Sequence, residues 1–229
     1  MATRTFAGAG ALAVALIAPA AAQAAPIMAP LKPCYVTADT SAGPQSEGMQ
    51  IVAAGFAPNA SVDLTVDGEA YPGGAGLQAD ADGVLPVPPI PAPFVEKGTR
   101  EFTVTLTEQG NPANTVSTTT KSTALGVKLR PNEARPSDRI RFKGSGFTED
   151  KAIWAHYLYK GKVRKTVRMA RRPRGGCGGF KARRRQIPVD KPGLGNWTIQ
   201  FDQSRRFKDP AVEPVVFVRL GIRIRLVRD

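Results

Sequence analysis

Hydrophobic and polar residues alternate strictly near the end of the chain, from residue 218 to residue 226. Aliphatic side chains occupy every second position, and three of the four positions between them are arginine. The aliphatic residues are Val218, Leu220, Ile222, Ile224 and Leu226, and Arg219, Gly221, Arg223 and Arg225 separate them. A period of two is typical of a β-strand with one buried and one solvent-facing side. We therefore predict a strand here with its arginines pointing outward.

Shorter segments show the same alternation. Residues 102–106 and 197–201 are apolar at every second position, which places Trp197 in a core. The runs 62–66 and 153–159 end at Asp67-Gly68 and Lys160-Gly161, which are hairpin signals because such turns need positive φ. Prolines between residues 86 and 93 favour an extended edge segment, and no window has a helical period. These patterns predict an all-β protein.

Two stretches of the chain repeat one pattern. Residues 55–62 and 146–153 both begin with Gly-Phe, both follow a short apolar alternation and both precede a strand. They lie 91 residues apart, and residues 102–106 and 197–201 are separated by a similar interval. That period is too long for a solenoid repeat and matches a whole small β domain.

The pattern Phe142-Lys143-Gly144-Ser145-Gly146-Phe147 resembles the bacterial immunoglobulin-like repeats of exported and cell-envelope proteins, including the IPT/TIG type. The chain is also similar to tandem-domain secreted proteins of high-GC Gram-positive bacteria, a resemblance that implies no particular chemistry. The resemblance implies two tandem immunoglobulin-like antiparallel β-sandwich domains, at residues 25–125 and 126–229. The Cys…Trp…Cys core of antibody domains is absent.

The first 24 residues read as a signal peptide. Arg4 precedes an apolar stretch, and Ala22-Gln23-Ala24 supplies the small-x-small cleavage pattern. A membrane helix is the alternative, but the apolar run is shorter than the roughly 20 residues needed to span a bilayer. No second long apolar run follows. We expect a secreted protein, extracellular or associated with the cell wall, with no membrane span.

The chain has two cysteines, Cys34 and Cys177. An even number of cysteines in an exported protein favours one disulfide, and two free thiols are the alternative. A metal site is disfavoured because His156 is the only histidine in the sequence. We expect neither a metal nor a cofactor.

Charge separates the two halves of the chain. The formal net charge is +13, but residues 25–125 hold 4 basic and 10 acidic residues, whereas residues 126–229 hold 27 basic and 9 acidic ones. We place the boundary near residues 118–126, a short polar stretch between strand patterns. The asymmetry suggests an anionic partner for the second half, or contact between the halves.

Candidate ligand-binding residues follow from the resemblance. In an immunoglobulin-like sandwich the last strand would pair with the 197–201 strand, which neighbours the 153–159 strand. Trp154 and His156 would then face solvent beside the arginines, unless the register is shifted by one residue. A solvated arginine face without a ligand is the plain alternative. The candidate anion-binding residues are Arg164, Arg168, Arg183, Arg185, Arg219, Arg223, Arg225, Trp154 and His156.

Catalytic motifs are weak. His156 has no Ser or Cys partner by motif, and Asp80-Ala81-Asp82-Gly83 lacks the later glutamate of a calcium loop. We therefore predict a non-enzymatic binding or adhesion module of the cell envelope. Its partners would be anionic cell-wall polymers, such as teichoic-acid-like chains, or acidic polysaccharide, with nucleic acid less favoured. The alternatives are a small-molecule carrier like the chromophore-binding immunoglobulin-like apoproteins, and an enzyme with a hidden site around His156.

Overall fold

A computed structural model describes residues 25–40, 43–212 and 216–226. The predicted signal peptide, residues 1–24, lies outside the described residues. Within these ranges all regular structure is β, in seventeen strands and no helix. The prediction of an all-β protein is confirmed. Accordingly, the described part of the chain has no helix long and apolar enough to cross a membrane.

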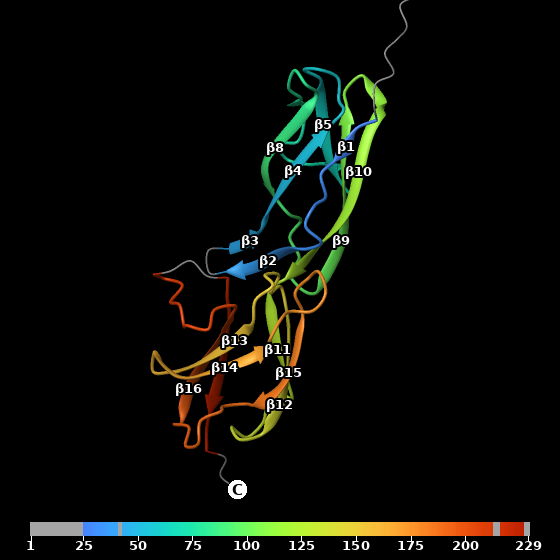
Figure 1. Ribbon diagram of the computed structural model, residues 1–229. Coiled ribbons are helices and arrows are strands. Elements are labelled where there is room, and N and C mark those ends of the chain that lie inside the picture. The colour runs from blue at the N-terminus through green and yellow to red at the C-terminus, as the bar shows by residue number, and fades with distance from the viewer. Residues whose placement is uncertain (1–24, 41–42, 213–215, 227–229) are drawn as a thin grey trace, which may run out of the picture.

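The strands gather into two lobes that lie end to end (Figure 1). The N-terminal lobe contains β1 to β10 and the C-terminal lobe contains β11 to β17. Each lobe has its own cluster of buried apolar side chains. Phe56, Leu64 and Phe102 belong to the first cluster, and Phe147 and Trp197 belong to the second. Trp197 is 2% exposed, so its predicted core position is confirmed.

The N-terminal lobe is made of two sheets. The smaller has the order β1-β4-β8, and the larger has the order β3-β2-β10-β9-β5-β6, with β7 also pairing with β5. The proline-rich β8 is an edge strand, as predicted. The strands are β1 (Ile27–Met28), β2 (Tyr35–Thr40), β3 (Gly43–Ser46), β4 (Gly48–Ala54), β5 (Ser61–Val66), β6 (Glu69–Ala70), β7 (Leu77–Gln78), β8 (Val84–Pro91), β9 (Thr99–Glu108) and β10 (Asn111–Ala124).

One pair of strands departs from the predicted antiparallel arrangement. β2 runs parallel to the end of β10, with Tyr35 beside Ser122 and Thr37 beside Ala124. β1 pairs with β4 in the smaller sheet, and the chain then crosses to the larger sheet, where β2 lies beside β10. The remaining named strand pairs are antiparallel.

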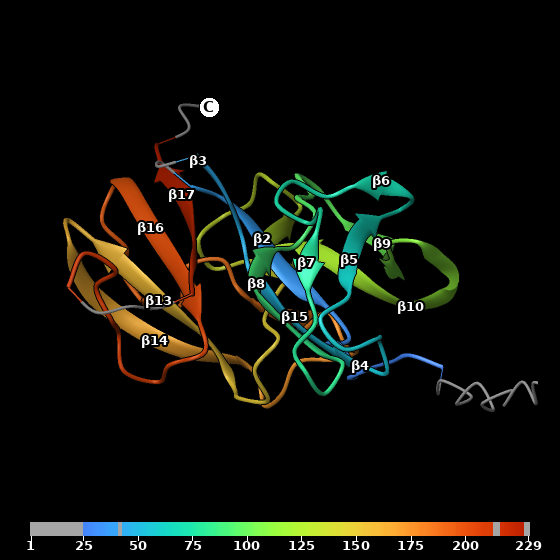
Figure 2. The same cartoon turned by 90° about the horizontal axis from the view of Figure 1, so that it is seen from above.

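The C-terminal lobe pairs a three-stranded sheet, β11-β12-β15, with a four-stranded sheet, β14-β13-β16-β17. Seen from above, β13, β14, β16 and β17 lie together at one side of the molecule (Figure 2). The last strand pairs with the strand that contains Trp197, which in turn pairs with the strand that contains Trp154, as predicted. The strands are β11 (Gly126–Arg130), β12 (Arg139–Ser145), β13 (Ile153–Tyr159), β14 (Lys162–Ala170), β15 (Phe180–Arg185), β16 (Gly195–Asp202) and β17 (Val218–Ile224).

Both predicted hairpins are present. Asp67 and Gly68 have φ values of 54° and 83° in the turn between β5 and β6, and Lys160 and Gly161 have 51° and 73° between β13 and β14. Two consecutive positive φ values match the right-handed twist of the flanking strands. Glycine avoids the steric cost that Cβ would add in this conformation.

The two Gly-Phe segments adopt the same local structure. Gly55 and Phe56 donate their N–H groups to the carbonyl of Gly83, and Gly146 and Phe147 donate theirs to the carbonyls of Cys177 and Gly178. Phe56 and Phe147 are both buried, at 3% and 1% exposure. A Cβ added to Gly83 would lie 2.2 Å from the Phe56 carbonyl oxygen, and one added to Gly178 would lie 2.3 Å from that of Phe147. In both lobes, therefore, a second glycine allows the loops to meet.

The polar stretch at the predicted boundary, residues 118–126, does not lie between strands as expected. Residues 118–124 are the last part of β10, and only Leu125 separates it from β11. Thr119 and Lys121 are exposed, whereas Thr120, Ser122 and Thr123 are buried. The polar stretch is therefore part of a long strand that carries polar side chains on both of its faces.

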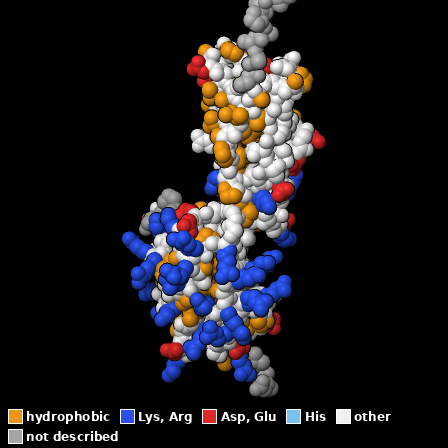
Figure 3. Space-filling model, turned by 45° about the vertical axis from the view of Figure 1, so that its right-hand side comes forward, with side chains coloured by type: hydrophobic (Ala, Val, Ile, Leu, Met, Phe, Trp, Pro, Cys, Tyr) orange, Lys and Arg blue, Asp and Glu red, His pale blue; other side chains and the backbone are white. Residues whose placement is uncertain are grey.

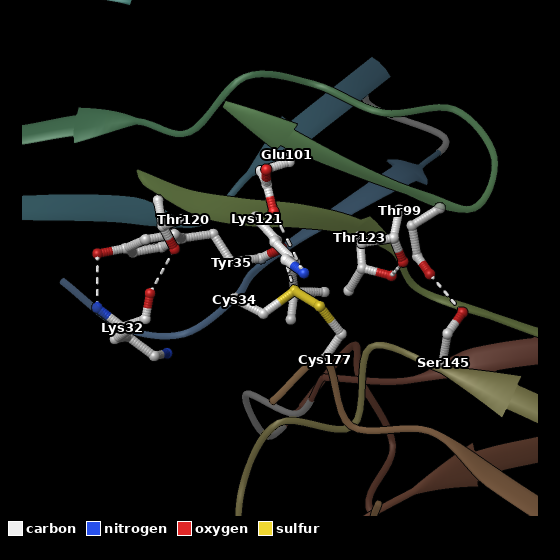
Figure 4. The surroundings of a disulfide bond; sticks show 12 residues. Lys32, Cys34, Tyr35, Thr99, Glu101, Thr120, Lys121, Thr123, Ser145 and Cys177 are labelled. Carbon is white, nitrogen blue, oxygen red and sulfur yellow. Dashed lines mark hydrogen bonds and ion pairs between the residues drawn. A yellow bond between two sulfur atoms is a disulfide. The ribbon is translucent and has the colours of Figure 1, made fainter. Parts of the chain in front are cut away.

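A disulfide joins the lobes, so the pairing of Cys34 with Cys177 is confirmed. Cys34 lies just before β2, and Cys177 lies in the glycine-rich loop before β15 (Figure 4). Their Cα atoms are 5.0 Å apart across a sequence separation of 143 residues. Two hydrogen bonds support the junction, from Leu125 N–H to the Thr37 carbonyl (2.7 Å) and from Ser145 Oγ to the Ala124 carbonyl (2.8 Å). The lobes are therefore fastened at two nearby points.

Candidate functional site

Lysine and arginine side chains crowd the C-terminal lobe, which is the lower part of the molecule in Figure 3. From the same side the N-terminal lobe shows mostly apolar and neutral polar atoms. The charge asymmetry of the sequence is thus an asymmetry between the two ends of an elongated molecule. The arrangement of these cations on particular strands determines what they can bind.

The outer face of the β11-β12-β15 sheet carries the most regular set of cations. Along β12, Ile140 and Phe142 are buried at 1% and 0% exposure, while Arg139, Arg141 and Lys143 are exposed. β11 and β15 alternate in the same way. The eight outward cations, called the cationic face below, are Lys128, Arg130, Arg139, Arg141, Lys143, Lys181, Arg183 and Arg185.

Strand register arranges the cationic face in rows that run across the three strands. Directly opposite residues are paired by the β11–β12 and β12–β15 ladders. One row is all lysine, the next is all arginine, and the third has two arginines. The rows are Lys128–Lys143–Lys181, Arg130–Arg141–Arg183 and Arg139–Arg185.

Few anionic groups compensate these charges. Within the residues that the structure describes, the only carboxylate within ion-pair distance of the cationic face is that of Asp190, 3.9 Å from Arg185 at the edge. Cβ atoms of directly opposite residues lie about 4.5–5.5 Å apart, and like charges in such positions are destabilising. The cationic face is therefore an unfavourable arrangement for a sheet that contacts only water.

The exposed sheet face of the N-terminal lobe has a different set of cross-strand pairs. At the exposed positions of β9 and β10, opposite residues are mostly hydroxyl pairs, including Thr105 with Ser117 at 2.8 Å between oxygens and Thr103 with Thr119 at 3.3 Å. Where charges face each other, they are opposite, as in Glu101 with Lys121. The like-charged rows are thus a property of one sheet in one lobe.

The outer face of the β14-β13-β16-β17 sheet is covered by part of the chain between β16 and β17. His156 points outward from β13, yet its side chain has 0% exposure. Its ring meets Phe207 edge-on, with the ring centroids 5.6 Å apart. The prediction that His156 lies on the surface is therefore wrong, although the outward direction is right. The reason is the loop, which lacks any periodic pattern that would reveal where it packs.

A buried hydrogen-bond network surrounds His156. Nδ1 lies 3.0 Å from the Thr166 hydroxyl, while Nε2 faces Asp202 Oδ1 at 3.3 Å and the Ser204 carbonyl at 3.1 Å. Nε2 meets two acceptors, so it carries a hydrogen. Asp202 also accepts from Ser204 N–H at 2.9 Å. The network holds the loop on the sheet and leaves no ring nitrogen free for a ligand.

Gln200 and Arg219 extend this network toward the last strand. The Gln200 amide donates to Asp202 and to the Lys208 carbonyl, each at 2.9 Å, and accepts from Arg219 Nε at 3.0 Å. Arg219 also lies 3.9 Å from Asp209. Arg219 is thus already engaged by side chains of its own lobe.

Trp154 is outward and half-buried. It lies opposite Arg168 in the β13–β14 register, and the Arg205 guanidinium lies 5.9 Å from its ring centroid. The outward register of Trp154 is confirmed, because Ile153, Ala155 and Tyr157 are the residues of β13 that belong to the core cluster of this lobe. Arg205, from the covering loop, takes one of the contacts that a ligand would need.

The nine predicted anion-binding residues therefore do not form one site. Arg183 and Arg185 belong to the cationic face. Arg164 lies in a bulge of β14, and its guanidinium is 5.9 Å from the Tyr159 ring centroid. Arg223 and Arg225 line a cavity of about 700 Å³, whose lining also includes Glu133 and Asp138. Arg168 and Arg219 lie on the covered sheet, as do Trp154 and His156.

Sequence reasoning missed most of the cationic face. Lys128, Arg130, Arg139 and Arg141 are not among the nine candidates, and Lys143 appears only within the Gly-Phe pattern. The signal was present, since basic residues alternate with apolar ones at 127–130 and 139–143. The local alternation does not reveal that β12 pairs with β15, because that pairing joins residues about forty positions apart.

The cavities of the protein are lined by mixed side chains. One cavity of about 820 Å³ includes Glu149, Lys151 and Arg205 in its lining. Another, of about 400 Å³, lies between the lobes and includes Lys32 and Glu47. A third, also about 400 Å³, includes Lys160, Asp209 and Arg219. None of these cavities, nor the one near Arg223, contains a residue of the cationic face.

Metal ligands are not gathered anywhere in the described ranges. No group of three His, Cys, Asp or Glu side chains there is arranged to hold a metal ion. Asp80, the first residue of the sequence that suggested a calcium loop, accepts hydrogen bonds from Asp82 N–H (2.9 Å) and Val84 N–H (2.8 Å). This carboxylate stabilises a turn before β8.

Comparison with models of known protein families gives no match for this chain, and comparison with curated protein sequences gives none either.

Proposed function

We propose that the protein is an exported, non-enzymatic binding or adhesion module of the cell envelope, whose C-terminal lobe binds anionic polymers. The cationic face is the observation that carries this proposal. Its like-charged rows cost stability in the free protein, and a polyanion laid over them would remove that cost. Binding would also release counterions from the polymer, which favours association at low salt.

The immunoglobulin-like assignment of the two lobes belongs to the same proposal. In such sandwiches the second and fifth strands share one sheet, and the third, sixth and seventh share the other. β12 and β15 pair in the first way, and β13, β16 and β17 in the second. In the N-terminal lobe, β4 and β8 correspond to the first pair, and β5, β9 and β10 to the second set. Together with the two matching Gly-Phe loops, these orders support two tandem repeats of the IPT/TIG-like kind.

Export is supported by the signal-peptide pattern of residues 1–24 and by the disulfide. Disulfides form and persist in oxidising compartments outside the cytosol. Cys34 is 1% exposed, as expected of a structural bond rather than a reactive thiol pair. We therefore place the mature protein outside the cell or in the cell wall.

A non-enzymatic role is supported by the environment of His156. Thr166, His156 and Asp202 are connected as a nucleophile, base and carboxylate would be, but the His156 and Asp202 side chains have 0% exposure. A general base must come within hydrogen-bond reach of its substrate. Here the ring nitrogens are occupied and covered, so the cluster fits a structural role.

The carrier alternative expects a deep apolar cleft. Each of the four cavities described above has charged side chains in its lining, so no observation favours that alternative here.

The test is retention of the intact, disulfide-bonded protein on immobilised poly(glycerol phosphate) and on polyglucuronate, across a salt series. We expect retention at low salt that falls steeply as salt rises, because phosphate and carboxylate contacts are screened and counterions compete. Neutral dextran is the matched control matrix. Failure to bind either polyanion at low salt, or binding that does not depend on salt, would contradict the proposed function.

A further inference from the structure

We infer that the cationic face binds a linear phosphodiester polymer with a small polyol repeat, with the polymer lying along β12 and three consecutive phosphates meeting the three rows. This inference rests on the proposed function and specifies its ligand and its site. It assigns binding to the β11-β12-β15 sheet and not to the sheet that contains Trp154. The argument uses row spacing, side-chain chemistry and the shape of the face.

Row spacing sets the spacing of the ligand's charges. Successive rows are two residues apart on β12, at Arg139, Arg141 and Lys143. Two extended residues, which contain six backbone bonds, span about 7 Å. Six bonds also link the phosphorus atoms of consecutive glycerol phosphate units, so an extended chain of this type has a repeat of about 7 Å on the same bond-count estimate. Each row can therefore meet one phosphate.

The chemistry of the rows suits phosphate. The central row is formed by Arg130, Arg141 and Arg183. Guanidinium groups offer paired N–H donors that match phosphate oxygens in a bidentate manner. The neighbouring row, Lys128, Lys143 and Lys181, provides compact charges that tolerate variable geometry. A phosphodiester has one negative charge, and several cations from different strands surround each position.

The cationic face has no aromatic side chains on which bases or sugar rings could stack. Its outward positions on β11, β12 and β15 include no aromatic side chain. Proteins that bind single-stranded nucleic acids combine cations with aromatic rings on which bases stack. Trp154, the outward tryptophan of this lobe, is on the opposite sheet with Arg205 against it. A charged polymer that has neither bases nor sugar rings fits the cationic face best.

The shape of the face also favours an extended ligand. Its eight cations are exposed along one face of a three-stranded sheet. Compact ligands are usually held in concave pockets, whereas a flat row of charges gains its affinity from many weak contacts along a chain. The three rows define the length of chain that this sheet can contact.

The first measurement is a chain-length series. Glycerol phosphate oligomers with one to six phosphates are titrated into the full, disulfide-bonded protein at low salt. We expect affinity to rise steeply up to three phosphates and then to change little, and a log–log salt slope near about −2 for three neutralised phosphates. A continuous rise through six phosphates, or equal affinity for all lengths, would overturn the inference.

The second measurement compares two variants that each lose four positive charges. The face variant carries Arg141→Gln, Lys143→Gln, Lys181→Gln and Arg183→Gln. The control carries Lys162→Gln, Lys165→Gln, Arg168→Gln and Arg223→Gln on the other sheet. We expect about tenfold or greater loss of affinity for the six-phosphate oligomer in the face variant, and a much smaller loss in the control. Equal losses would show that net charge alone attracts the polymer, which overturns the inference but not the proposed function.

Ligand competition and folding controls complete the design. We expect oligothymidylate and oligoglucuronate of equal charge to bind more weakly than the glycerol phosphate oligomer. If either binds as well or better, the polyol phosphate assignment is wrong, while anionic-polymer binding stands. A further variant, Arg141→Lys with Arg183→Lys, keeps the charge but loses the bidentate donors and should retain part of the affinity. Its melting temperature, compared with that of the parent, reports whether the sheet remains folded.

Discussion

Tyr157 and His156 are neighbours on β13, and burial gives them different roles. The His156 ring is surrounded by hydrogen-bond partners, so its burial stabilises the covering loop. The Tyr157 hydroxyl, on the core side, is also buried but has no hydrogen-bond partner. Burial raises the pKa of the Tyr157 phenol, although the Arg184 guanidinium acts in the opposite direction. A buried hydroxyl without a partner contributes desolvation cost and little else.

Replacement of Tyr157 by phenylalanine should therefore be tolerated at neutral pH. We expect the free energy of unfolding at pH 7 to stay the same or to rise by up to about 1 kcal/mol, because no hydrogen bond is lost. Urea unfolding measures it. Tyr35→Phe is the matched control: it removes the acceptor of the Lys32 N–H at 3.2 Å, so it should lower stability. A loss of stability in Tyr157→Phe equal to that in the control would contradict the prediction.

The same substitution should change the response to alkali. The folded-state pKa of Tyr157 lies above its unfolded value of about 10, so above that pH the unfolded chain has released a proton that the folded protein retains. Stability due to this group is complete below pH 10 and falls by at most about 1.4 kcal/mol per pH unit above it. Tyr157→Phe should flatten this fall, whereas Tyr35 and Tyr71, whose pKa values are also raised by burial, retain part of it.

At the scale of the element, the central strand β12 is constrained on both of its faces. Inward, Gly144 leaves room for Phe180: a Cβ at this position would lie 2.1 Å from the Phe180 ring. Outward, Arg141 lies between Arg130 and Arg183. The inner face thus serves packing. The outer face carries charges that packing does not require.

The outer face yields a prediction about stability and binding together. Arg141→Thr should increase the free energy of unfolding by about 0.2–1 kcal/mol at low salt, because it removes like-charge contacts on both sides and inserts a good strand former. The gain should shrink at high salt, where repulsion is screened. Affinity for the glycerol phosphate oligomer should fall in the same variant. Thermal melts at two salt concentrations measure the first effect.

The control for this variant lies on the N-terminal lobe. Lys121→Thr removes a charge that faces Glu101 and not another cation. It should give no comparable gain. If Arg141→Thr loses stability at low salt, the repulsion argument for the cationic face is wrong.

Strand patterns could be predicted from the sequence because alternation is a local property. The hairpins at Asp67-Gly68 and Lys160-Gly161 and the alternation of β17 needed only neighbouring residues. Two features were out of reach for physical reasons. Alternation separates inner from outer positions but does not reveal what covers an outer face, so the burial of His156 was missed. The like-charged rows depend on pairing between β12 and β15, a non-local contact that no sequence window contains.

At the scale of the whole molecule, two lobes with separate cores are held by one covalent bond and a one-residue junction at Leu125. The chain-entropy model assigns a closed loop of this length about 5 kcal/mol of stabilisation. The disulfide also keeps the loop that contains Gly176 against Pro33, since a Cβ at Gly176 would lie 2.9 Å from that proline's Cβ. The disulfide therefore stabilises the folded protein and also fixes the position of this loop against the N-terminal lobe.

Removal of the disulfide should weaken the protein and uncouple its lobes. We expect the variant with Cys34→Ser and Cys177→Ser to unfold at lower temperature, in two separable calorimetric transitions, because each lobe keeps its own core. The parent protein with its bond intact is the reference, and reductant added to the variant should have no effect. An unchanged melting profile in the variant would show that the noncovalent junction alone holds the lobes together.

The bond between Cys34 and Cys177 also determines how the protein would bear a mechanical load. Tension applied between the start of the N-terminal lobe and the end of the C-terminal lobe passes through the sulfur atoms, so the segment from residue 34 to residue 177 is shielded from extension. β12 and most of the N-terminal core lie inside that segment. Under a load applied between the two ends of the chain, these strands would therefore stay folded while the segments outside the crosslink are extended.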